Sequence, residues 1–273
     1  MPKLESLTDM GAVVTGASSG IGRVLAQELA IKGARVVLVA RREAELTELA
    51  EEISAHRQVF RTPLVIPCDV SDRDQVERAA ATATERIGNI DLLVNNAGYG
   101  HHRRFVDWNI DDMERMMRVN YFGSLYWTKA VLPGMISRRR GWLTFISSIA
   151  GRIAPPEESA YAASKFAVSG LAESLTNEVL DDGVHVLTVY PGVIQTPFFD
   201  KEALARMPAV ARRQMIAPEK LVKAILNALA SGRHELTFPR ALAAAYPARA
   251  IAPGFTRRQV KRRTIDSLSR EGR

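Results

Sequence analysis

The 273-residue chain contains one cysteine, Cys68, and no apolar run of 18 or more residues. A single cysteine excludes an intrachain disulfide and a metal site built from several cysteines. The short apolar runs argue against a membrane-spanning helix. Residues 1–6 also lack the apolar stretch that a secretory signal carries. We therefore expect a cytoplasmic protein.

The charge of the chain is concentrated at one end. The formal net charge is +7, yet residues 240–273 contain nine Lys or Arg and only two acids, so residues 1–239 sum to zero. No nucleic-acid-binding motif accompanies this basic segment, and we expect no nucleic-acid partner. We favour a solvated helical face for the segment over a peripheral contact with anionic lipid or a subunit contact.

Apolar runs alternate with amphipathic stretches from residue 11 onward, which predicts strands followed by helices. The predicted strands are 11–15, 35–40, 64–67, 91–95, 141–147, 184–190 and 235–238. The predicted helices are 20–32, 43–57, 73–87, 111–138, 160–182 and 218–231. Repeated alternation of this kind indicates an α/β fold: one doubly wound, Rossmann-like domain with a seven-stranded, mostly parallel sheet and helices on both faces.

Two segments depart from the alternation. Residues 197–216 are predicted to form a lid or substrate loop, in which Phe198, Phe199, Met207 and Met215 either line a pocket for a lipophilic substrate or pack beneath the loop. Prolines interrupt the chain after residue 238, before a last basic helical stretch. We therefore divide the chain into a domain of residues 1–240 and a basic helical extension of residues 241–273.

A glycine-rich turn joins the first predicted strand to the first helix. Gly16, Gly20 and Gly22 lie at this junction, with Ser18, Ser19 and Ile21 between them. Glycines here allow a tight turn and a close approach of backbone to a pyrophosphate at the helix N-terminus. The turn predicts a dinucleotide site, although a glycine-rich turn without a ligand is the alternative.

Residues after the next strands indicate which dinucleotide binds. Arg41 and Arg42 end the second strand, about 20 residues after the glycines, where arginines favour a 2′-phosphate and an acid would favour a 2′-hydroxyl. We therefore expect NADP(H) rather than NAD(H); the alternative is that both arginines open a polar helix, with Glu43 and Glu45 as partners. Further candidate contacts follow the third and fourth strands: Asp69, Val70, Asn96, Ala97 and Gly98.

Four further residues are candidates for the chemistry. Tyr161 and Lys165 lie four apart and so share one face of a helix. A nearby ammonium, together with the positive nicotinamide of an oxidised cofactor, would stabilise the phenolate and lower the tyrosine pKa from about 10. Ser148 follows the fifth strand, where its hydroxyl can hold a substrate oxygen, and Asn120 can kink its helix or anchor a water that passes protons to Lys165.

The chain resembles a short-chain dehydrogenase/reductase of the compact single-domain branch. The features that carry the resemblance are, in order, the glycine turn, Asp69, the turn at residues 95–98, Asn120, Ser148, Tyr161, Lys165 and the segment 191–196. The resemblance implies Tyr161 as general acid/base, Lys165 on the ribose hydroxyls, Ser148 on the carbonyl and Asn120 in the proton relay. It also implies cofactor contacts from Pro191, Gly192, Val193 and Thr196, and a homodimer or homotetramer formed through the helices at 111–138 and 160–182.

Two segments differ from the family's common pattern. Some NADP-preferring members carry a basic residue just before the second glycine of the turn, where this chain has Ser19. Residues 101–104, His-His-Arg-Arg, are unusually basic for a region near the substrate; they either touch an anionic group or form a solvated loop. We expect no metal, because two histidines without further ligands do not make a metal site.

These features predict an NADP(H)-dependent oxidoreductase that interconverts a carbonyl and an alcohol on a lipophilic small molecule. The alternative is a cofactor-binding sensor or scaffold with little catalytic activity. No catalytic position of the family pattern is missing, and this favours the enzyme.

Overall fold

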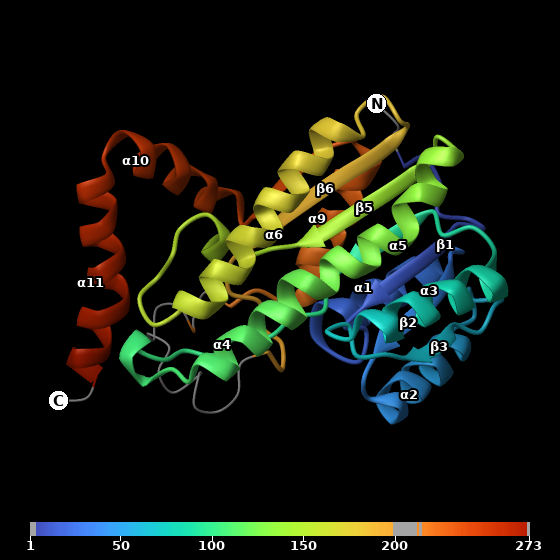
Figure 1. Ribbon diagram of the computed structural model, residues 1–273, viewed down its shortest axis with the longest axis horizontal. Coiled ribbons are helices and arrows are strands. Elements are labelled where there is room, and N and C mark those ends of the chain that lie inside the picture. The colour runs from blue at the N-terminus through green and yellow to red at the C-terminus, as the bar shows by residue number, and fades with distance from the viewer. Residues whose placement is uncertain (1–3, 199–211, 213–214, 272–273) are drawn as a thin grey trace.

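The structure, a computed structural model, describes residues 4–198, 212 and 215–271, with only the backbone described for 263–271. Its centre is a sheet of seven parallel strands in the order β3-β2-β1-β4-β5-β6-β7 (Figure 1). The strands are β1 (Gly11–Thr15), β2 (Arg35–Ala40), β3 (Leu64–Pro67), β4 (Leu92–Asn95), β5 (Gly141–Ile146), β6 (Val184–Pro191) and β7 (Glu235–Phe238). The predicted doubly wound parallel sheet is confirmed.

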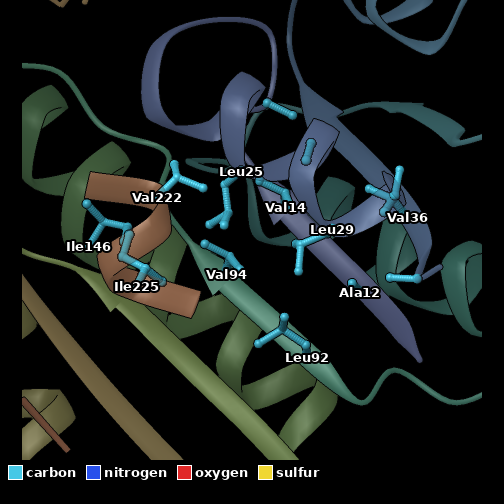
Figure 2. Packing of buried hydrophobic residues seen from close by; sticks show 14 of the residues in the cluster. Ala12, Val14, Leu25, Leu29, Val36, Leu92, Val94, Ile146, Val222 and Ile225 are labelled. Carbon is cyan, nitrogen blue, oxygen red and sulfur yellow. The ribbon is translucent and has the colours of Figure 1, made fainter. Parts of the chain in front are cut away.

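Helices cover both faces of the sheet. One face carries α1 (Gly20–Ile31), α2 (Glu43–Ser54) and α9 (Pro218–Ala230), and the other carries α3 (Arg73–Ile87), α5 (Gly123–Ser137) and α6 (Ser159–Glu178). Side chains alternate along each strand, so Val14 packs in the first core and its neighbour Val13 in the second. Figure 2 shows Leu25 of α1 and Val222 of α9 meeting the strand residues of the first core.

The strand order places a crevice at the middle of the sheet. The chain winds outward from β1 to β3, returns to the other side of β1 as β4, and winds outward again to β7. Connections after β1 and after β4 therefore leave in opposite directions, and in open α/β sheets ligands bind at this switch point, beyond the carboxyl ends of the strands. The glycine turn follows β1, and residues 96–98 follow β4.

The helix predicted over 111–138 is divided in three. A short α4 (Ile110–Met117) passes through a π-helical turn, η2 (Arg118–Phe122), into α5. Asn120 lies buried in this turn, and its side chain bonds to the backbone of Tyr99 in another loop. The spacing of hydrophobic residues does not reveal a π-helical turn whose stabilising partner, the backbone of Tyr99, is distant in sequence. Turns of this kind often occur at functional sites.

The remaining elements lie at the carboxyl ends of the strands and beyond β7. Two single 3-10 turns are η1 (Phe105–Asp107) and η3 (Ile149–Gly151). After β7 come η4 (Arg240–Ala244), α10 (Ala245–Ile251) and the basic helix α11 (Pro253–Glu271), which stands at one side of the molecule (Figure 1). Within the described ranges, no helix has both the length and the apolar character needed to cross a membrane.

We expect Leu29→Ala to lower the free energy of unfolding by about 2–5 kcal/mol, because Leu29 of α1 is fully buried against the sheet and its truncation leaves a cavity. Urea denaturation followed by circular dichroism measures the change. Phe60→Ala is the matched control: Phe60 is 92% exposed, and its replacement should alter stability by no more than about 0.5 kcal/mol. Equal losses in the two variants would contradict the assignment of this core.

Candidate active site

A pocket of about 840 Å³ opens at the carboxyl ends of the central strands. One end is formed by the glycine turn, by the ends of β2 and β3 and by the loop after β4. The other end is formed by the loops at 99–102 and 153–158, with Leu242 and Val260 of the C-terminal extension. Its size suits a dinucleotide end and a substrate end in one continuous cleft.

The glycine turn is closed by backbone contacts that leave no room for side chains. Gly16 has a φ of 66°, and a Cβ atom there would lie 2.8 Å from the Cα of Ala97. A Cβ atom on Gly22 would lie 2.4 Å from the carbonyl oxygen of Gly16 and 2.5 Å from Nδ2 of Asn96. These two positions therefore require glycine, one for its conformation as well as its size and the other for close packing.

Thr15 and Asn96 bind the glycine turn to the loop after β4. The Thr15 hydroxyl donates to the carbonyl oxygen of Val94 (3.2 Å) and accepts from the backbone N–H groups of Asn96 and Ala97 (both 3.0 Å). The Asn96 amide donates in return to the carbonyl oxygen of Thr15 (2.9 Å). The turn predicted around Asn96 is thus a support for the glycine turn, and Thr15 is a positioning residue that the sequence analysis did not identify.

The N-terminus of α1 fits a phosphate group. Its N-cap residue, Ser19, makes no side-chain capping bond, and the first turn contains no acidic residue. Free N–H groups and the positive end of the helix dipole therefore face the pocket without a competing carboxylate. The pocket is lined here by Ser18, Ser19, Gly20 and Ile21. Thr196 lies opposite Gly20: a Cβ atom added to the glycine would lie 3.1 Å from the Cβ atom of Thr196. These residues together fit the pyrophosphate of a dinucleotide.

Arg41 and Arg42 border the dinucleotide end. Arg42 precedes α2 and forms an ion pair with Glu45 (3.2 Å), as the polar-helix alternative anticipates. The same guanidinium donates to the hydroxyl of Ser18 (2.9 Å), so it also reaches the glycine turn. Arg41 is exposed and forms no ion pair with any residue that the structure describes. Both cations therefore line the dinucleotide end of the pocket, beside the glycine turn.

Asp69 and Val70 extend this wall after β3. Asp69 Oδ1 accepts from the backbone N–H (2.9 Å) and the hydroxyl (2.7 Å) of Ser71, which fixes the carboxylate at the pocket edge. Further predicted cofactor contacts line the same pocket, namely Ala97, Gly98, Pro191, Gly192 and Val193.

Ser148, Tyr161 and Lys165 meet at the centre of the pocket. Lys165 Nζ lies 5.7 Å from the centre of the Tyr161 ring and donates to the carbonyl oxygen of Ile146 (2.8 Å). Ser148 is the N-cap of η3 and accepts from the backbone N–H of Ala150 (3.1 Å), and its hydroxyl lies close enough to Tyr161 to lower the pKa of the phenol. The spacing Ser148-x12-Tyr161-x3-Lys165 thus brings hydroxyl, phenol and ammonium together.

Burial shifts the two titrating groups in opposite directions. It raises the pKa of Tyr161 above its usual value, more than the Ser148 hydrogen bond lowers it, and the nearby Glu158 carboxylate raises it further. Burial lowers the pKa of Lys165 to about 8, because the ammonium loses hydration. The lowered tyrosine pKa was expected beside both an ammonium and an oxidised nicotinamide; in the protein alone, desolvation of the phenolate raises the pKa instead. Tyr161 is a protonated phenol at neutral pH.

Asn120 supports the lysine side of this group. Its amide donates to the carbonyl oxygen of Tyr99 and to the hydroxyl of Ser164 (both 2.9 Å), and its oxygen accepts from the Tyr99 N–H (3.0 Å). Gly98 lies between Asn120 and Lys165: a Cβ atom there would be 3.0 Å from the asparagine Oδ1 and 3.3 Å from the lysine Nζ. Asn120 therefore holds the loop after β4 against α6, beside Lys165.

The substrate end brings together two residues that the sequence analysis named, Phe198 and His102, and one that it did not, Glu158. Phe198 packs against Tyr161 with ring centres 5.6 Å apart, and His102 Nδ1 lies 3.3 Å from Glu158 Oε1. The lining includes His101 and His102 but neither Arg103 nor Arg104, and it does not include Met215. Phe199 and Met207 lie outside the described residues. The one signal in the sequence that could have identified Glu158 is its position three residues before Tyr161, which places it one helical turn away.

No metal centre is formed among the described residues, which hold no group of three His, Cys, Asp or Glu side chains placed to bind an ion.

The C-terminal extension contributes Leu242, Ala245 and Val260 to the lining of the pocket. Its anchoring is polar as well, since Thr237 Oγ1 and the Tyr246 hydroxyl lie 2.9 Å apart and Arg249 donates to the carbonyl oxygen of Arg152.

We expect Gly22→Ala to weaken NADPH binding by at least about 10-fold, because the added methyl would push Gly16 and Asn96 out of the turn. Titration of nucleotide fluorescence measures the dissociation constant. Gly170→Ala in α6 is the control, since a Cβ atom there meets nothing within 4 Å. Unchanged affinity in Gly22→Ala would show that the glycine turn does not form the nucleotide site.

Comparison with known proteins agrees with this geometry. The sequence profile described as short chain dehydrogenase matches residues 11–206. A bovine (Bos taurus) 3-ketodihydrosphingosine reductase is 39% identical over 241 residues, which cover 85% of this chain and 71% of the relative. A dehydrogenase/reductase SDR family protein 7-like from Anopheles gambiae is 36% identical over 250 residues, covering 88% and 78%.

A solved structure gives the same result for the fold. The alcohol dehydrogenase from Thermococcus sibiricus complexed with 5-hydroxy-NADP superposes with a TM-score of 0.74 at 27% identity, covering 84% of this chain and 95% of that one. The chain therefore belongs to the short-chain dehydrogenase/reductase family and is an NAD(P)-dependent oxidoreductase acting on carbonyl and alcohol groups.

Proposed function

We propose that this protein is an NADP(H)-dependent reductase of a lipophilic carbonyl compound, with Tyr161 as its general acid/base. The observation that carries the proposal is the single pocket in which Ser148, Tyr161 and Lys165 face the same space as the glycine turn and Arg42. Proton transfer and nucleotide binding are thereby brought together at one site.

Each catalytic side chain has a distinct part. The bound cofactor supplies the hydride. Ser148 holds the substrate oxygen by a hydrogen bond, and the protonated Tyr161 hydroxyl donates its proton to that oxygen as the alcohol forms. Lys165 binds ribose hydroxyls and replenishes the proton, since its pKa of about 8 lies close to neutral pH. Asn120 is a positioning residue, because its contacts hold the loop after β4 beside Lys165.

The preference for NADP(H) rests on charge at the end of β2. Two adjacent guanidinium groups, those of Arg41 and Arg42, border the pocket there, and no acid at this point competes for the ribose. A 2′-phosphate would receive charge-assisted contacts from both, whereas a 2′-hydroxyl would leave Arg41 without an anion and Arg42 paired only with Glu45. The Thermococcus structure, whose ligand is a modified NADP, supports this preference by analogy.

The lipophilic substrate is supported by the lining of the far end of the pocket. Ile153, Pro155, Phe198, Leu242 and Val260 present apolar surface there. The bovine relative is named for reduction of a 3-keto sphingoid, a long-chain compound, and this is the substrate class we extend to the present chain. The C-terminal extension would then cover part of the substrate while its basic side chains remain solvated.

Assembly and location belong to the same proposal. We propose a cytoplasmic homodimer or homotetramer formed through the long helices α5 and α6. Phe166, on α6, is 37% exposed, which is the kind of apolar surface that a subunit contact would cover.

We expect Tyr161→Phe to reduce turnover at least about 100-fold while NADPH affinity stays within about 2-fold, because only the transferable proton is removed. The assay follows loss of NADPH absorbance with long-chain ketones, beside fluorescence titration of NADPH. Tyr126→Phe, which removes a hydroxyl on α5 outside the pocket, is the control. Retained turnover in Tyr161→Phe would overturn the mechanism, and tight NADPH binding without turnover in the unaltered protein would favour a sensor.

We expect the double variant Arg41→Gln/Arg42→Gln to lower the preference for NADPH over NADH, measured as the ratio of kcat/KM values, by about 10- to 100-fold. The loss corresponds to about one hydrogen bond to a charged group, which contributes about 1.5–3 kcal/mol. Arg57→Gln, at an exposed position after α2, should leave the ratio unchanged. An unaltered ratio in the double variant would mean that other residues read the phosphate.

A further inference from the structure

A carboxyl group lies at the substrate end of the pocket, one helical turn before the proposed general acid. Glu158 immediately precedes α6, three residues before Tyr161, and its side chain lines the pocket with only 17% of its surface exposed. Tyr161 lines the same pocket, one turn further along α6.

The burial of this carboxyl is not explained by helix capping. Glu158 is the N-cap residue of α6, yet its side chain accepts no capping hydrogen bond. Burial instead raises the pKa of Glu158 to about 7, which means that ionisation is costly where the carboxyl lies. A buried acid without a capping role requires another reason for its position.

Its single polar neighbour leaves part of the carboxyl available. Oε1 lies 3.3 Å from Nδ1 of His102, whereas Oε2 has no hydrogen-bond partner among the residues that the structure describes. A role as a latch for the loop at 99–104 is already filled by the backbone, since the N–H of Arg103 donates to the carbonyl oxygen of Glu157 (2.8 Å). The carboxylate therefore has an oxygen to offer to a ligand.

A cation on the substrate would complete this arrangement. Ser148 and Tyr161 fix the position of the reacting oxygen, and Glu158 approaches from the first turn of the same helix. In so sheltered a place an ammonium group gains a charge-assisted hydrogen bond to Oε2, the carboxylate oxygen that His102 does not contact. A neutral polar group would leave the cost of ionising the carboxyl uncompensated.

We propose that Glu158 is a specificity-determining residue that pairs with an ammonium group close to the reacting carbonyl, so that the preferred substrates are lipophilic amino ketones and the corresponding amino alcohols. The proposal rests on the proposed function and adds to it the charge of the substrate. The apolar residues beyond Glu158 would receive the hydrocarbon chain, and the carboxylate would fix which carbonyl faces Tyr161.

The test compares two ketones with NADPH at saturation: a long-chain 2-amino-3-ketone, and the same ketone with a 2-methyl group in place of the amine. We expect the unaltered protein to prefer the amino ketone by at least about 10-fold in kcat/KM. Glu158→Gln should abolish the preference by raising KM for the amino ketone. Because the Glu158 carboxylate also raises the pKa of Tyr161, the effect is measured as the ratio of the two kcat/KM values, which a change at Tyr161 alters equally for both ketones.

Two matched variants separate charge recognition from structure. Glu173→Gln, an exposed change on the same helix, should keep the preference. His102→Gln removes the neighbour of Glu158 but leaves the carboxylate, so it too should keep the preference. If Glu158→Gln and His102→Gln lower both substrates equally, the pair is only a latch and the proposal is overturned.

Failure of the proposal differs from failure of the proposed function. Turnover of the neutral ketone as fast as that of the amino ketone by the unaltered protein would overturn the role of Glu158 and leave the reductase intact. If neither ketone is reduced, calorimetry with a long-chain 2-amino alcohol and its 2-methyl counterpart, in the presence of NADP⁺, still decides the point. Equal affinities there, or an amine preference that survives in Glu158→Gln, would overturn the proposal.

Discussion

The close approach of two loops at the switch point of the sheet determines the rest of the site. Thr15 and Asn96 bond the end of β1 to the loop after β4, and Gly22 packs directly on the carbonyl of Gly16. Since the loop after β4 continues into Gly98, the same contacts set the distance between the nucleotide end of the pocket and Lys165. One hydroxyl and one amide thus join the glycine turn to the loop that lies beside Lys165.

Burial then gives three ionisable groups properties that they would not have in water. It favours the neutral form of each, so the pKa values of Tyr161 and Glu158 rise and that of Lys165 falls. The consequence is a phenol that keeps its proton until a reacting oxygen requires it, beside a lysine and a carboxyl that both titrate near neutral pH. Lys165 would stabilise a negative charge that forms on the substrate oxygen, and Glu158 would stabilise a positive charge carried by the substrate.

The sequence predicted the features that depend on local pattern. Continuous apolar, β-branched runs located β1 and β2, which are buried on both faces. The predicted bounds of β3 and β7 also agree with the structure, although these two strands lie at the edges of the sheet and are partly exposed. The π-turn at Asn120 was not predictable, because the bonds that stabilise it come from the loop at Tyr99, about twenty residues away in the chain. The lowered tyrosine pKa was expected beside an ammonium and an oxidised nicotinamide, but the desolvation that raises it in the protein alone follows only from the packed pocket.

The two ends of the pocket are built from different parts of the chain. This difference explains why the sequence identifies the class of reaction but not the substrate. The nucleotide end is built from backbone atoms close to the central strands, where only glycine or a short polar side chain fits, so residue identity reveals function. The substrate end is assembled from three segments distant in sequence, the loops at 99–102 and 153–158 and the C-terminal extension at Leu242 and Val260. Apolar residues there fit many hydrocarbon shapes alike. A buried charge is different, because its desolvation must be compensated by one kind of partner, and it therefore carries chemical information that the shape of the pocket does not.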